Sequence, residues 1–229
     1  MLNLHSAPTP AGFEITFPNA ITREGVMGTE WNGWTNFVTP SHNLTIPFTR
    51  MASGSLDYEP GLLENSNEES FRNTWGRPMS LGTRAHQLAM YVIYDNPLQY
   101  FIGNPSQARK EPEFMTFLGS MPTTWDETII LEGKPGEYIV TARLKDGIWY
   151  LGAMTDWTER ELNVDLSPLG INYFDLEGII DGVNANEYAS DYQWLRSSAN
   201  SNQQLTLRLA KGGGAVIKIL PVQPSPQQP

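Results

Sequence analysis

The chain has 229 residues, of which 40% are hydrophobic and 11% aromatic, and at about 150 residues per domain this length corresponds to roughly one and a half domains. That composition argues against a disordered protein, and the absence of cysteine excludes a disulfide scaffold, a thiolate zinc site and a cysteine nucleophile. A net charge of −10 leaves no cationic surface of the kind that binds nucleic acid or an anionic membrane.

No run of about 18 apolar residues is present, so the sequence predicts no membrane span. The first residues, Met1 to His5, show no basic region followed by a long apolar core, so no signal peptide is visible. Two explanations remain open at this point. Either the protein stays where it is made, or these residues are not the true N-terminus.

The first half of the chain, to about residue 120, is rich in proline and glycine and predicts few regular elements. Apolar residues at helical spacing predict a helix from about Ser80 to Tyr94, with Ser80 as its cap and Asn96-Pro97 as its end. The apolar run Leu98 to Ile102 predicts a buried strand, and a second helix is expected from Pro112 or Glu113 to Leu118. This alternation is typical of an α/β protein.

The second half predicts an antiparallel β-sandwich of about seven short strands separated by turn sequences. Asp146-Gly147, between two β-rich runs, is a strong hairpin signal. The predicted strands are Thr128 to Leu131, Tyr138 to Lys145, Ile148 to Met154, Glu161 to Leu166, Tyr173 to Asp181, Gln204 to Ala210 and Gly214 to Leu220. Residues 223–229, rich in proline and glutamine, predict a disordered tail.

The most concentrated chemistry lies in a glycine-containing loop from residue 22 to residue 34. Glu24 and Glu30 are six residues apart, and the glycines between them allow both carboxylates to face one point. Carboxylates suit Ca²⁺, and a partly desolvated carboxylic acid can protonate a leaving oxygen. Trp31 and Trp34 offer flat apolar faces that suit the C–H face of a sugar ring. The alternative is that two solvated glutamates of an acidic protein have this spacing by chance.

The three histidines give weaker signals. His5 lies at a predicted strand end, His42 follows a proline in a loop, and His86 on the predicted helix is most simply a packing or surface residue. The sequence has no H-E-x-x-H zinc motif, no phosphate-binding loop and no G-x-S-x-G nucleophile elbow.

Several ordered blocks of the sequence resemble the C-terminal portion of glycoside hydrolase family 97, which contains α-glucosidases and α-galactosidases. The resemblance spans about residues 3–221, and its strength lies in the order and joint occurrence of the blocks. They are Phe17 to Asn19, Thr22 to Glu30, Pro47 to Met51, Asp57 to Gly61, His86 to Val92, Pro97 to Gln99, Pro122 to Thr128, Gly136 to Tyr138 and Trp149 to Trp157.

The resemblance implies a calcium-dependent enzyme that hydrolyses α-glycosidic bonds of oligosaccharides, with a (β/α)8 barrel and a C-terminal β-domain. It places Glu30 at the position of the general acid and Glu24 at a calcium-binding carboxylate, with Glu30 also contacting the metal. His5 matches a histidine at the end of a barrel strand that contacts the sugar. Together with Trp31 and Trp34, it is expected to bind substrate.

Two departures from the family pattern refine this expectation. The inverting branch has a glutamate directly after the histidine, whereas this sequence has Ser6, so the chain is more similar to the retaining branch. The strand that carries the nucleophile of the retaining branch would precede Met1. A barrel needs about 250 residues, so the expected domains are the C-terminal half of a barrel over residues 1–120, a β-sandwich over residues 121–222 and the tail.

Two functions are therefore expected. The first is a portion of an α-galactosidase or α-glucosidase that retains configuration, periplasmic or secreted in its full-length form. The alternative is a non-catalytic carbohydrate-binding or assembly fragment, inactive because the nucleophile is missing. The open edge of a half-barrel would also favour self-association.

Overall fold

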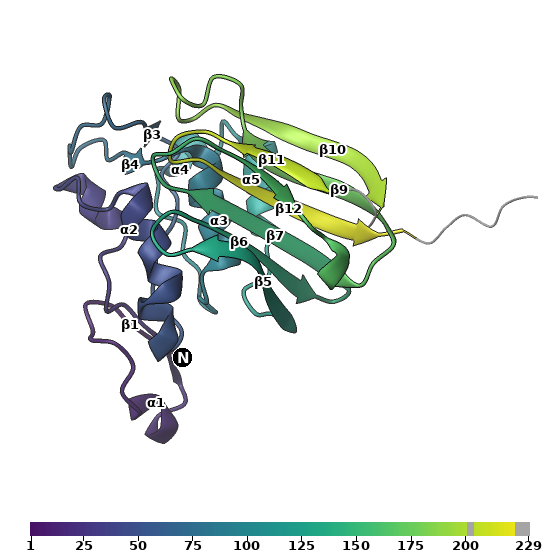
Figure 1. Cartoon of the computed structure of the whole chain (residues 1–229). Helices are drawn as coiled ribbons and strands as arrows, with labels where there is room; N and C mark the ends of the chain where they lie inside the picture. Colours follow the sequence, from purple (N-terminus) through teal and green to yellow (C-terminus); the bar gives the residue numbers. More distant parts are fainter. Residues whose placement is uncertain (201–203, 223–229) are drawn as a thin grey trace, which may run out of the picture.

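The computed structural model describes residues 1–200 and 204–222, and the predicted tail 223–229 lies outside them. The C-terminal half forms an antiparallel sheet, and the more irregular N-terminal half lies along one side of it (Figure 1). In the part of the chain that is described, no helix combines the length and the apolar character needed to cross a membrane.

The sheet has six strands in the order β10-β9-β12-β7-β6-β5, and each neighbouring pair is antiparallel. A separate antiparallel pair, β8 with β11, packs against one of its faces. The strands are β5 (Glu127–Lys134), β6 (Tyr138–Lys145), β7 (Ile148–Thr155), β8 (Arg160–Val164), β9 (Tyr173–Asp181), β10 (Tyr192–Asn200), β11 (Leu205–Leu209) and β12 (Gly214–Pro221).

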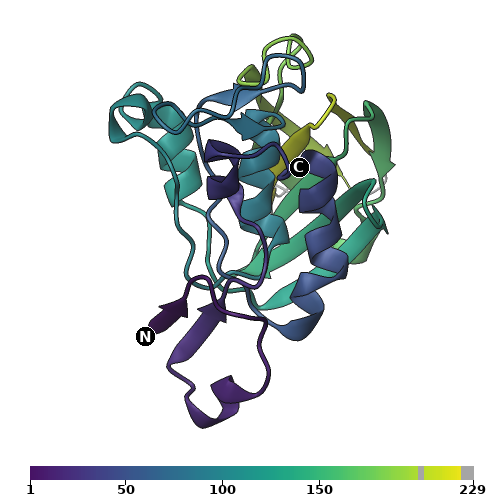
Figure 2. The same cartoon turned by 90° about the vertical axis from the view of Figure 1, so that its left-hand side faces the viewer.

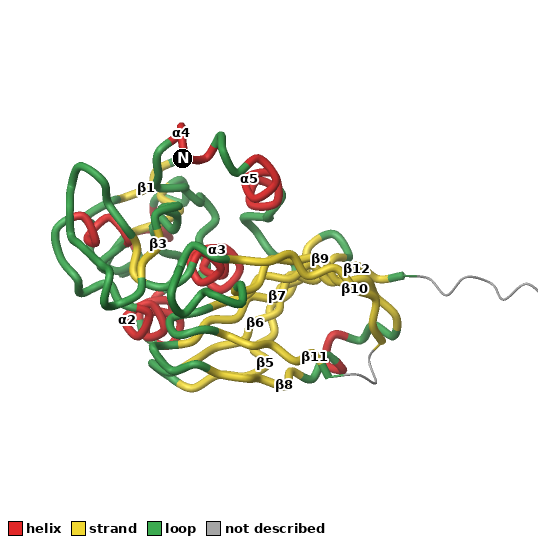
Figure 3. Tube along the Cα trace, turned by 90° about the horizontal axis from the view of Figure 1, so that it is seen from above, coloured by secondary structure: helices red, strands yellow, loops and turns green. Residues whose placement is uncertain are grey.

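Both faces of the six-stranded sheet are buried, as the residues of β7 show. Trp149, Leu151 and Ala153 pack into the core shared with β8 and β11, whereas Tyr150 and Met154 pack into the core on the opposite face. Successive side chains of a strand point to opposite faces, so a strand covered on both sides reads as a continuous apolar run. The two cores therefore lie on either side of one sheet (Figure 3).

The predicted antiparallel β-domain is confirmed, and the strands from Tyr138 to Lys145 and from Tyr173 to Asp181 have the predicted bounds. The hairpin between β6 and β7 is also confirmed, with positive φ at both Asp146 (48°) and Gly147 (80°), as a type I′ turn requires. Strand β10 was not predicted. It is an edge strand with a largely polar and exposed sequence, which gives no clear alternation of apolar residues.

The predicted helix from Ser80 to Tyr94 is α3 (Arg84–Ile93), and its start differs from the expectation. The side chain of Thr83 accepts the N–H of His86 and caps the helix, while Ser80 belongs to a short strand, β4 (Ser80–Leu81). Every residue of α3 is buried, because the helix lies between the sheet and the N-terminal segments (Figure 2). The second predicted helix is confirmed as α5 (Pro112–Gly119).

The half-barrel expected over residues 1–120 stays a prediction, because the parallel pairing of this region is limited to short segments. The described strands of this region make two separate parallel pairs, β1 with β2 and β3 with β4, rather than an arc of long strands alternating with helices. The remaining elements are β1 (Leu2–Leu4), α1 (Phe13–Thr16), β2 (Ala20–Arg23), η1 (Thr29–Gly33), α2 (Pro40–Thr45), η2 (Ile46–Phe48), η3 (Arg50–Ser53), β3 (Asn65–Ser66) and α4 (Pro105–Ala108).

The predicted buried strand from Leu98 to Ile102 is wrong. Of its described residues only Ile102 pairs, through a single parallel bridge to Gly61. The physical reason is that closely spaced prolines and glycines interrupt this region.

Candidate active site

Three parallel segments end at one place in the N-terminal half. Strand β1 pairs with β2, and Arg23 at the end of β2 forms a parallel bridge with Leu56. The next residue of each segment is acidic or a histidine: His5 follows β1, Glu24 follows β2, and Asp57 follows Leu56. Because the carboxyl ends of parallel strands lie at one edge, the three side chains meet there.

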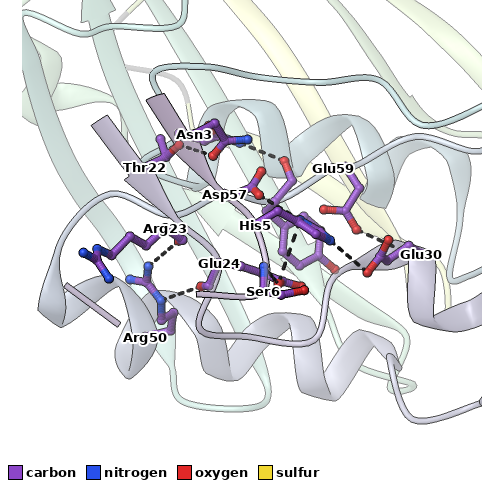
Figure 4. A network of polar contacts seen from close by, with 12 residues as sticks. Asn3, His5, Ser6, Thr22, Arg23, Glu24, Glu30, Arg50, Asp57 and Glu59 are labelled. Carbon is purple, nitrogen blue, oxygen red and sulfur yellow. Dashed lines mark hydrogen bonds and ion pairs between the residues drawn. The ribbon is translucent and has the colours of Figure 1, made fainter. Parts of the chain in front are cut away.

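His5 lies at the centre of this group (Figure 4). Its Nδ1 lies 2.9 Å from Oδ2 of Asp57 and 3.8 Å from Oε2 of Glu24, and its Nε2 lies 3.2 Å from Oε1 of Glu30. The backbone N–H of Ser6 donates to Oε2 of Glu24 (2.5 Å). One imidazole therefore joins two carboxylates of one loop, Glu24 and Glu30, with Asp57 from a distant part of the sequence.

A fourth carboxylate, that of Glu59, lies beside Glu30. The backbone N–H of Glu30 donates to Oε1 of Glu59 (3.1 Å), whereas Oε2 of Glu59 is buried and has no hydrogen-bond partner among the described residues. Gly28 makes this approach possible, because a Cβ at this position would lie 2.2 Å from Oε1 of Glu59. The glycine before the η1 turn thus places the backbone of Glu30 against a buried carboxylate.

The loop that carries Glu24 is fixed by its backbone. Gly25 has a φ of 55°, and its N–H donates to the carbonyl of Ala7 (2.8 Å). Arg50 is buried, and its guanidinium donates to the carbonyls of Glu24 (2.8 Å) and Arg23 (2.6 Å). The guanidinium of Arg50 binds these carbonyl oxygens and not the carboxylates of the group, so it is not a second cation beside His5 for them.

The charges of the group shift several pKa values. The hydrogen bond to Asp57, and then the charges of Glu24 and Glu30, raise the pKa of His5 to about 9, so the imidazole is a cation at neutral pH. Burial raises the pKa of Glu24 and raises that of Glu59 to about 7. Four carboxyl groups thus share one cationic neighbour.

Glu30 differs from the other three carboxylates in its exposure. Its side chain is 29% exposed, against 7% for Glu24 and 3% for Asp57, and Glu59 is buried. Only an accessible carboxyl group can reach a bond in an incoming molecule. Glu30 is therefore the member of the group best placed to act on a ligand.

The donor set fits a hard cation. Ligand atoms of His5, Glu24 and Glu30 lie within 4.8 Å of one another, as do those of His5, Asp57 and Glu59. Ca²⁺ takes oxygen ligands from carboxylates, and the buried unpartnered oxygen of Glu59 adds one such donor. Glu24, Glu30 and Glu59 are the residues that would hold the ion.

The structure thus brings together three of the predicted site residues, His5, Glu24 and Glu30. Trp31 and Trp34 lie next to them on η1 and its C-terminal end, with ring centroids 5.4 Å apart. Their roles in catalysis, metal binding and substrate binding stay predictions.

Sequence reasoning did not single out Asp57 or Glu59. Both lie in the block Asp57 to Gly61, and alternate residues of an extended segment point to the same side. Their spacing two residues apart, around Tyr58, was the signal that could have found them.

A buried chain of polar contacts connects this group to the β-sheet. The hydroxyl of Thr29 donates to that of Tyr58 (3.3 Å), which donates to Oδ1 of Asn43 (2.8 Å). Nδ2 of Asn43 lies 3.3 Å from Nε2 of His86, whose Nδ1 lies 3.1 Å from the carbonyl of Gly213 at the start of β12. Burial lowers the pKa of His86 to about 4, so this neutral histidine has the packing role that its sequence predicted.

Comparisons with known proteins show which family the chain resembles. Residues 124–220 match the family model described as "Glycosyl-hydrolase 97 C-terminal, oligomerisation". The chain is 40% identical over 224 residues to a retaining alpha-galactosidase of Bacteroides thetaiotaomicron, which covers 96% of this chain and 33% of that protein. It is 31% identical over 182 residues to a probable retaining alpha-galactosidase of Streptomyces bingchenggensis, covering 80% of this chain and 26% of that protein.

A solved structure of similar shape is a glycoside hydrolase family 97 enzyme from Pseudoalteromonas sp. strain K8 in complex with acarbose. The TM-score is 0.83 at 33% identity, and the match covers 96% of this chain and 35% of that one. The chain thus spans about a third of the length of these relatives. The predicted family resemblance is confirmed: the chain belongs to glycoside hydrolase family 97 and corresponds to the C-terminal portion of its members.

Proposed function

We propose that this chain carries the acid–base part of the active site of a retaining α-glycosidase, with Glu30 as its general acid. One observation carries the proposal: Glu30 is the accessible member of four carboxylates that meet where three parallel segments end. The printed names of the two curated relatives support an α-galactoside as the substrate, and an α-glucoside is the alternative.

The reaction has two steps in which Glu30 holds a proton at Oε1 or Oε2. In the first step Glu30 gives its proton to the glycosidic oxygen as the bond from that oxygen to the anomeric carbon breaks. A carboxylate nucleophile forms the new bond to the carbon. In the second step Glu30 takes a proton from water, and the water oxygen replaces the nucleophile. The α-configuration is retained after two inversions.

His5 orients Glu30 in this scheme. Its Nε2 contacts Oε1 of Glu30, while Asp57 holds the other side of the ring at 2.9 Å. With 46% of its side chain exposed, His5 can contact the sugar as well.

We propose that Ca²⁺ is held by Glu24 and Glu30, with Glu59 as a further ligand. When bound, the ion supplies positive charge that can neutralise carboxylates and polarise hydroxyl groups of a sugar. The test is calorimetric titration of the chain with Ca²⁺. We expect binding weaker than micromolar and its loss in Glu24→Gln, with Glu127→Gln, an exposed glutamate of β5, as the control. Submicromolar affinity, or binding that survives Glu24→Gln, would contradict this site.

The nucleophile is proposed to come from a segment of the parent enzyme that these 229 residues do not include. The parallel segments of residues 1–120 would then complete a barrel together with that segment, and residues 121–222 would form the C-terminal domain. The support is the position of His5, Glu24 and Asp57 at the carboxyl ends of parallel segments, where barrel enzymes carry their active sites.

A chimaera tests the proposed function. Residues 1–222 replace the matching segment of the Bacteroides retaining alpha-galactosidase, and turnover of nitrophenyl α-galactoside and α-glucoside is measured. We expect a folded chimaera that cleaves one of the two substrates and loses at least about 100-fold in kcat with Glu30→Gln. A folded chimaera without turnover, or one insensitive to Glu30→Gln, would overturn the assignment.

The second candidate function is a non-catalytic carbohydrate-binding or assembly module. The exposed ring of Trp34 favours it, because 41% of this large apolar residue is accessible. Fluorescence titration of the 229-residue chain with sugars separates the two candidates. Binding that survives Glu30→Gln but not Trp34→Ala, in a protein whose chimaera is inactive, would favour the binding module.

Self-association and location complete the proposal. Leu2, Phe13, Ile15 and Phe17 in and near the β1–β2 pair are exposed apolar residues. The family model that matches residues 124–220, in the other half of the chain, is described with the word oligomerisation. We therefore propose that the chain self-associates, and a concentration-independent monomer in sedimentation would contradict it.

The parent enzyme is proposed to be periplasmic or secreted, since its substrates are oligosaccharides.

A further inference from the structure

Three tryptophan rings form a row that begins next to the proposed acid. Trp31 directly follows Glu30, its ring centroid lies 5.4 Å from that of Trp34, and the centroid of Trp34 lies 5.2 Å from that of Trp75. Exposure increases along the row, from partly buried Trp31 to 41% for Trp34 and 72% for Trp75. The row therefore leads from Glu30 outward to solvent.

Trp75 comes from a different part of the chain, the connection between β3 and β4 (residues 67–79), and it is held in place. The ring lies against the backbone of Gly33, where a Cβ would be 2.7 Å from Cε3 of Trp75. Nδ2 of Asn73 donates to the carbonyl of Trp34 (3.0 Å), and Oγ1 of Thr74 donates to the carbonyl of Arg77 (3.0 Å). An ordered loop thus presents a large apolar ring to water.

We propose that Trp34 and Trp75 form a platform that binds the leaving-group sugars of an α-linked oligosaccharide. This inference rests on the proposed function and extends it, because it assigns to Trp75 a preference for longer chains. A ring face suits the apolar C–H face of a pyranose, and the neighbouring Arg72 and Asn73 are exposed and can donate to its hydroxyl groups.

The position of the row indicates which sugars it binds. A general acid protonates the oxygen between the cleaved sugar and its leaving group, so Glu30 marks the boundary between the two. His5 contacts the carboxylate of Glu30, whereas the tryptophans continue from its backbone toward solvent. The cleaved sugar is then assigned to the side of His5, and the leaving-group sugars to the platform.

A protein partner fits this surface less well. An aromatic side chain offers about 150–250 Å², so two partly exposed rings provide well under the roughly 800 Å² per partner of a standard protein interface. One or two sugar rings match the area that is available.

The test is calorimetric titration of the 229-residue chain with stachyose, a tetrasaccharide with two α-1,6-linked galactoses, and with methyl α-galactoside. Maltotetraose and methyl α-glucoside are titrated in parallel. We expect Trp75→Ala to weaken binding of the preferred tetrasaccharide by about 5- to 20-fold, in line with the loss of one stacked ring. Binding of the corresponding monosaccharide is expected to stay within twofold, and Trp75→Tyr is expected to restore most of the affinity. Tyr188→Ala is the control, because Tyr188 is 73% exposed.

The outcomes separate this inference from the proposed function. Three results would overturn the platform. Trp75→Ala could bind the tetrasaccharide with wild-type affinity, or Tyr188→Ala could lose as much affinity as Trp75→Ala. The third such result is a wild-type chain that binds neither tetrasaccharide. If binding depends on Trp75 while the folded chimaera is inactive, the platform stands and the hydrolase assignment fails.

Discussion

His5 shows how single residues determine the chemistry of the site. The imidazole would have a pKa near 6.5 in an ordinary environment, but Asp57 and two glutamates raise that pKa to about 9. Its charge is thus present over the whole neutral range. An orienting cation next to Glu30 is a consequence of two glutamates of one loop and of Asp57, which lies more than 25 residues further along the chain.

The first prediction concerns Asp57→Asn. Loss of the Asp57 carboxylate removes the largest cause of the shift, so the pKa of His5 should fall from about 9 toward 6.5. NMR titration of the His5 ring protons in calcium-free buffer measures it. Glu30→Gln is the matched variant. It should lower the pKa of His5 by less than Asp57→Asn does. A pKa that remains near 9 in Asp57→Asn would show that the hydrogen bond is not its cause.

At the scale of elements, the contact of α3 with the sheet joins the two halves of the molecule. Gly152 in β7 is one point of close approach: a Cβ there would lie 3.0 Å from Cβ of Val92 and 3.2 Å from the carbonyl of Ala89. A side chain would push the helix away from β7 and β12. Through His86 the same helix is part of the polar chain that reaches Thr29.

The second prediction follows from this contact. Gly152→Val should lower the free energy of unfolding by about 1–3 kcal/mol, because it overpacks the interface. Gly119→Val is the control, since nothing lies within 4 Å of a Cβ at the end of α5, and its effect should stay within about 0.5 kcal/mol. Urea denaturation measures both. Equal effects of the two substitutions would mean that α3 does not pack tightly on β7.

Asp181 connects several elements at the end of the sheet. Its Oδ2 accepts the N–H groups of Ala210 and Gly214 (2.9 Å each), while its Oδ1 is buried without a partner among the described residues. Burial raises the pKa of Asp181 from 3.8 to about 7. The folded protein therefore holds a proton between pH 4 and 7 that the unfolded chain has released.

The third prediction is a pH-dependent effect of Asp181→Asn. Protonation of the folded state at Asp181 contributes stability that is complete below pH 4 and is lost as the pH rises to about 7, with a slope of up to about 1.4 kcal/mol per pH unit. The variant lacks this slope, so its stability relative to wild type should increase from pH 5 to pH 7 and then level off. Asp175 is an exposed carboxyl of the same strand, so the stability of Asp175→Asn should change with pH as that of the wild type does. If the difference in stability between Asp181→Asn and wild type does not change with pH, Asp181 does not hold this proton in the folded protein.

At the scale of the whole molecule, the two halves differ in how far their sequences predict their structure. The β-domain was predictable because apolar runs, turn sequences and the Asp146-Gly147 hairpin are local signals. Strand β10 was not, since an exposed edge strand needs no apolar alternation. The half-barrel stays a prediction for a related reason: parallel pairing depends on partners distant in sequence, and here it is limited to short segments.

The candidate site shows the same division. Glu24 and Glu30 share one glycine-containing loop, so the sequence alone places them near each other. Asp57 and Glu59 join them through parallel pairing and through a backbone hydrogen bond, and their local spacing does not indicate which segment they will meet. The third ring of the tryptophan row likewise comes from a separate loop.

The central claim is that Glu30 gives a proton to the leaving group, and the dependence of the rate on that group tests it most directly. The measurement compares kcat/KM of the chimaera and of its Glu30→Ala variant on melibiose and on dinitrophenyl α-galactoside. A sugar needs protonation to leave, so the variant should lose about 10²- to 10⁴-fold on melibiose, and at most about tenfold on the aryl glycoside, whose leaving group needs no proton. Equal losses on the two substrates would contradict the assignment of Glu30 as the general acid.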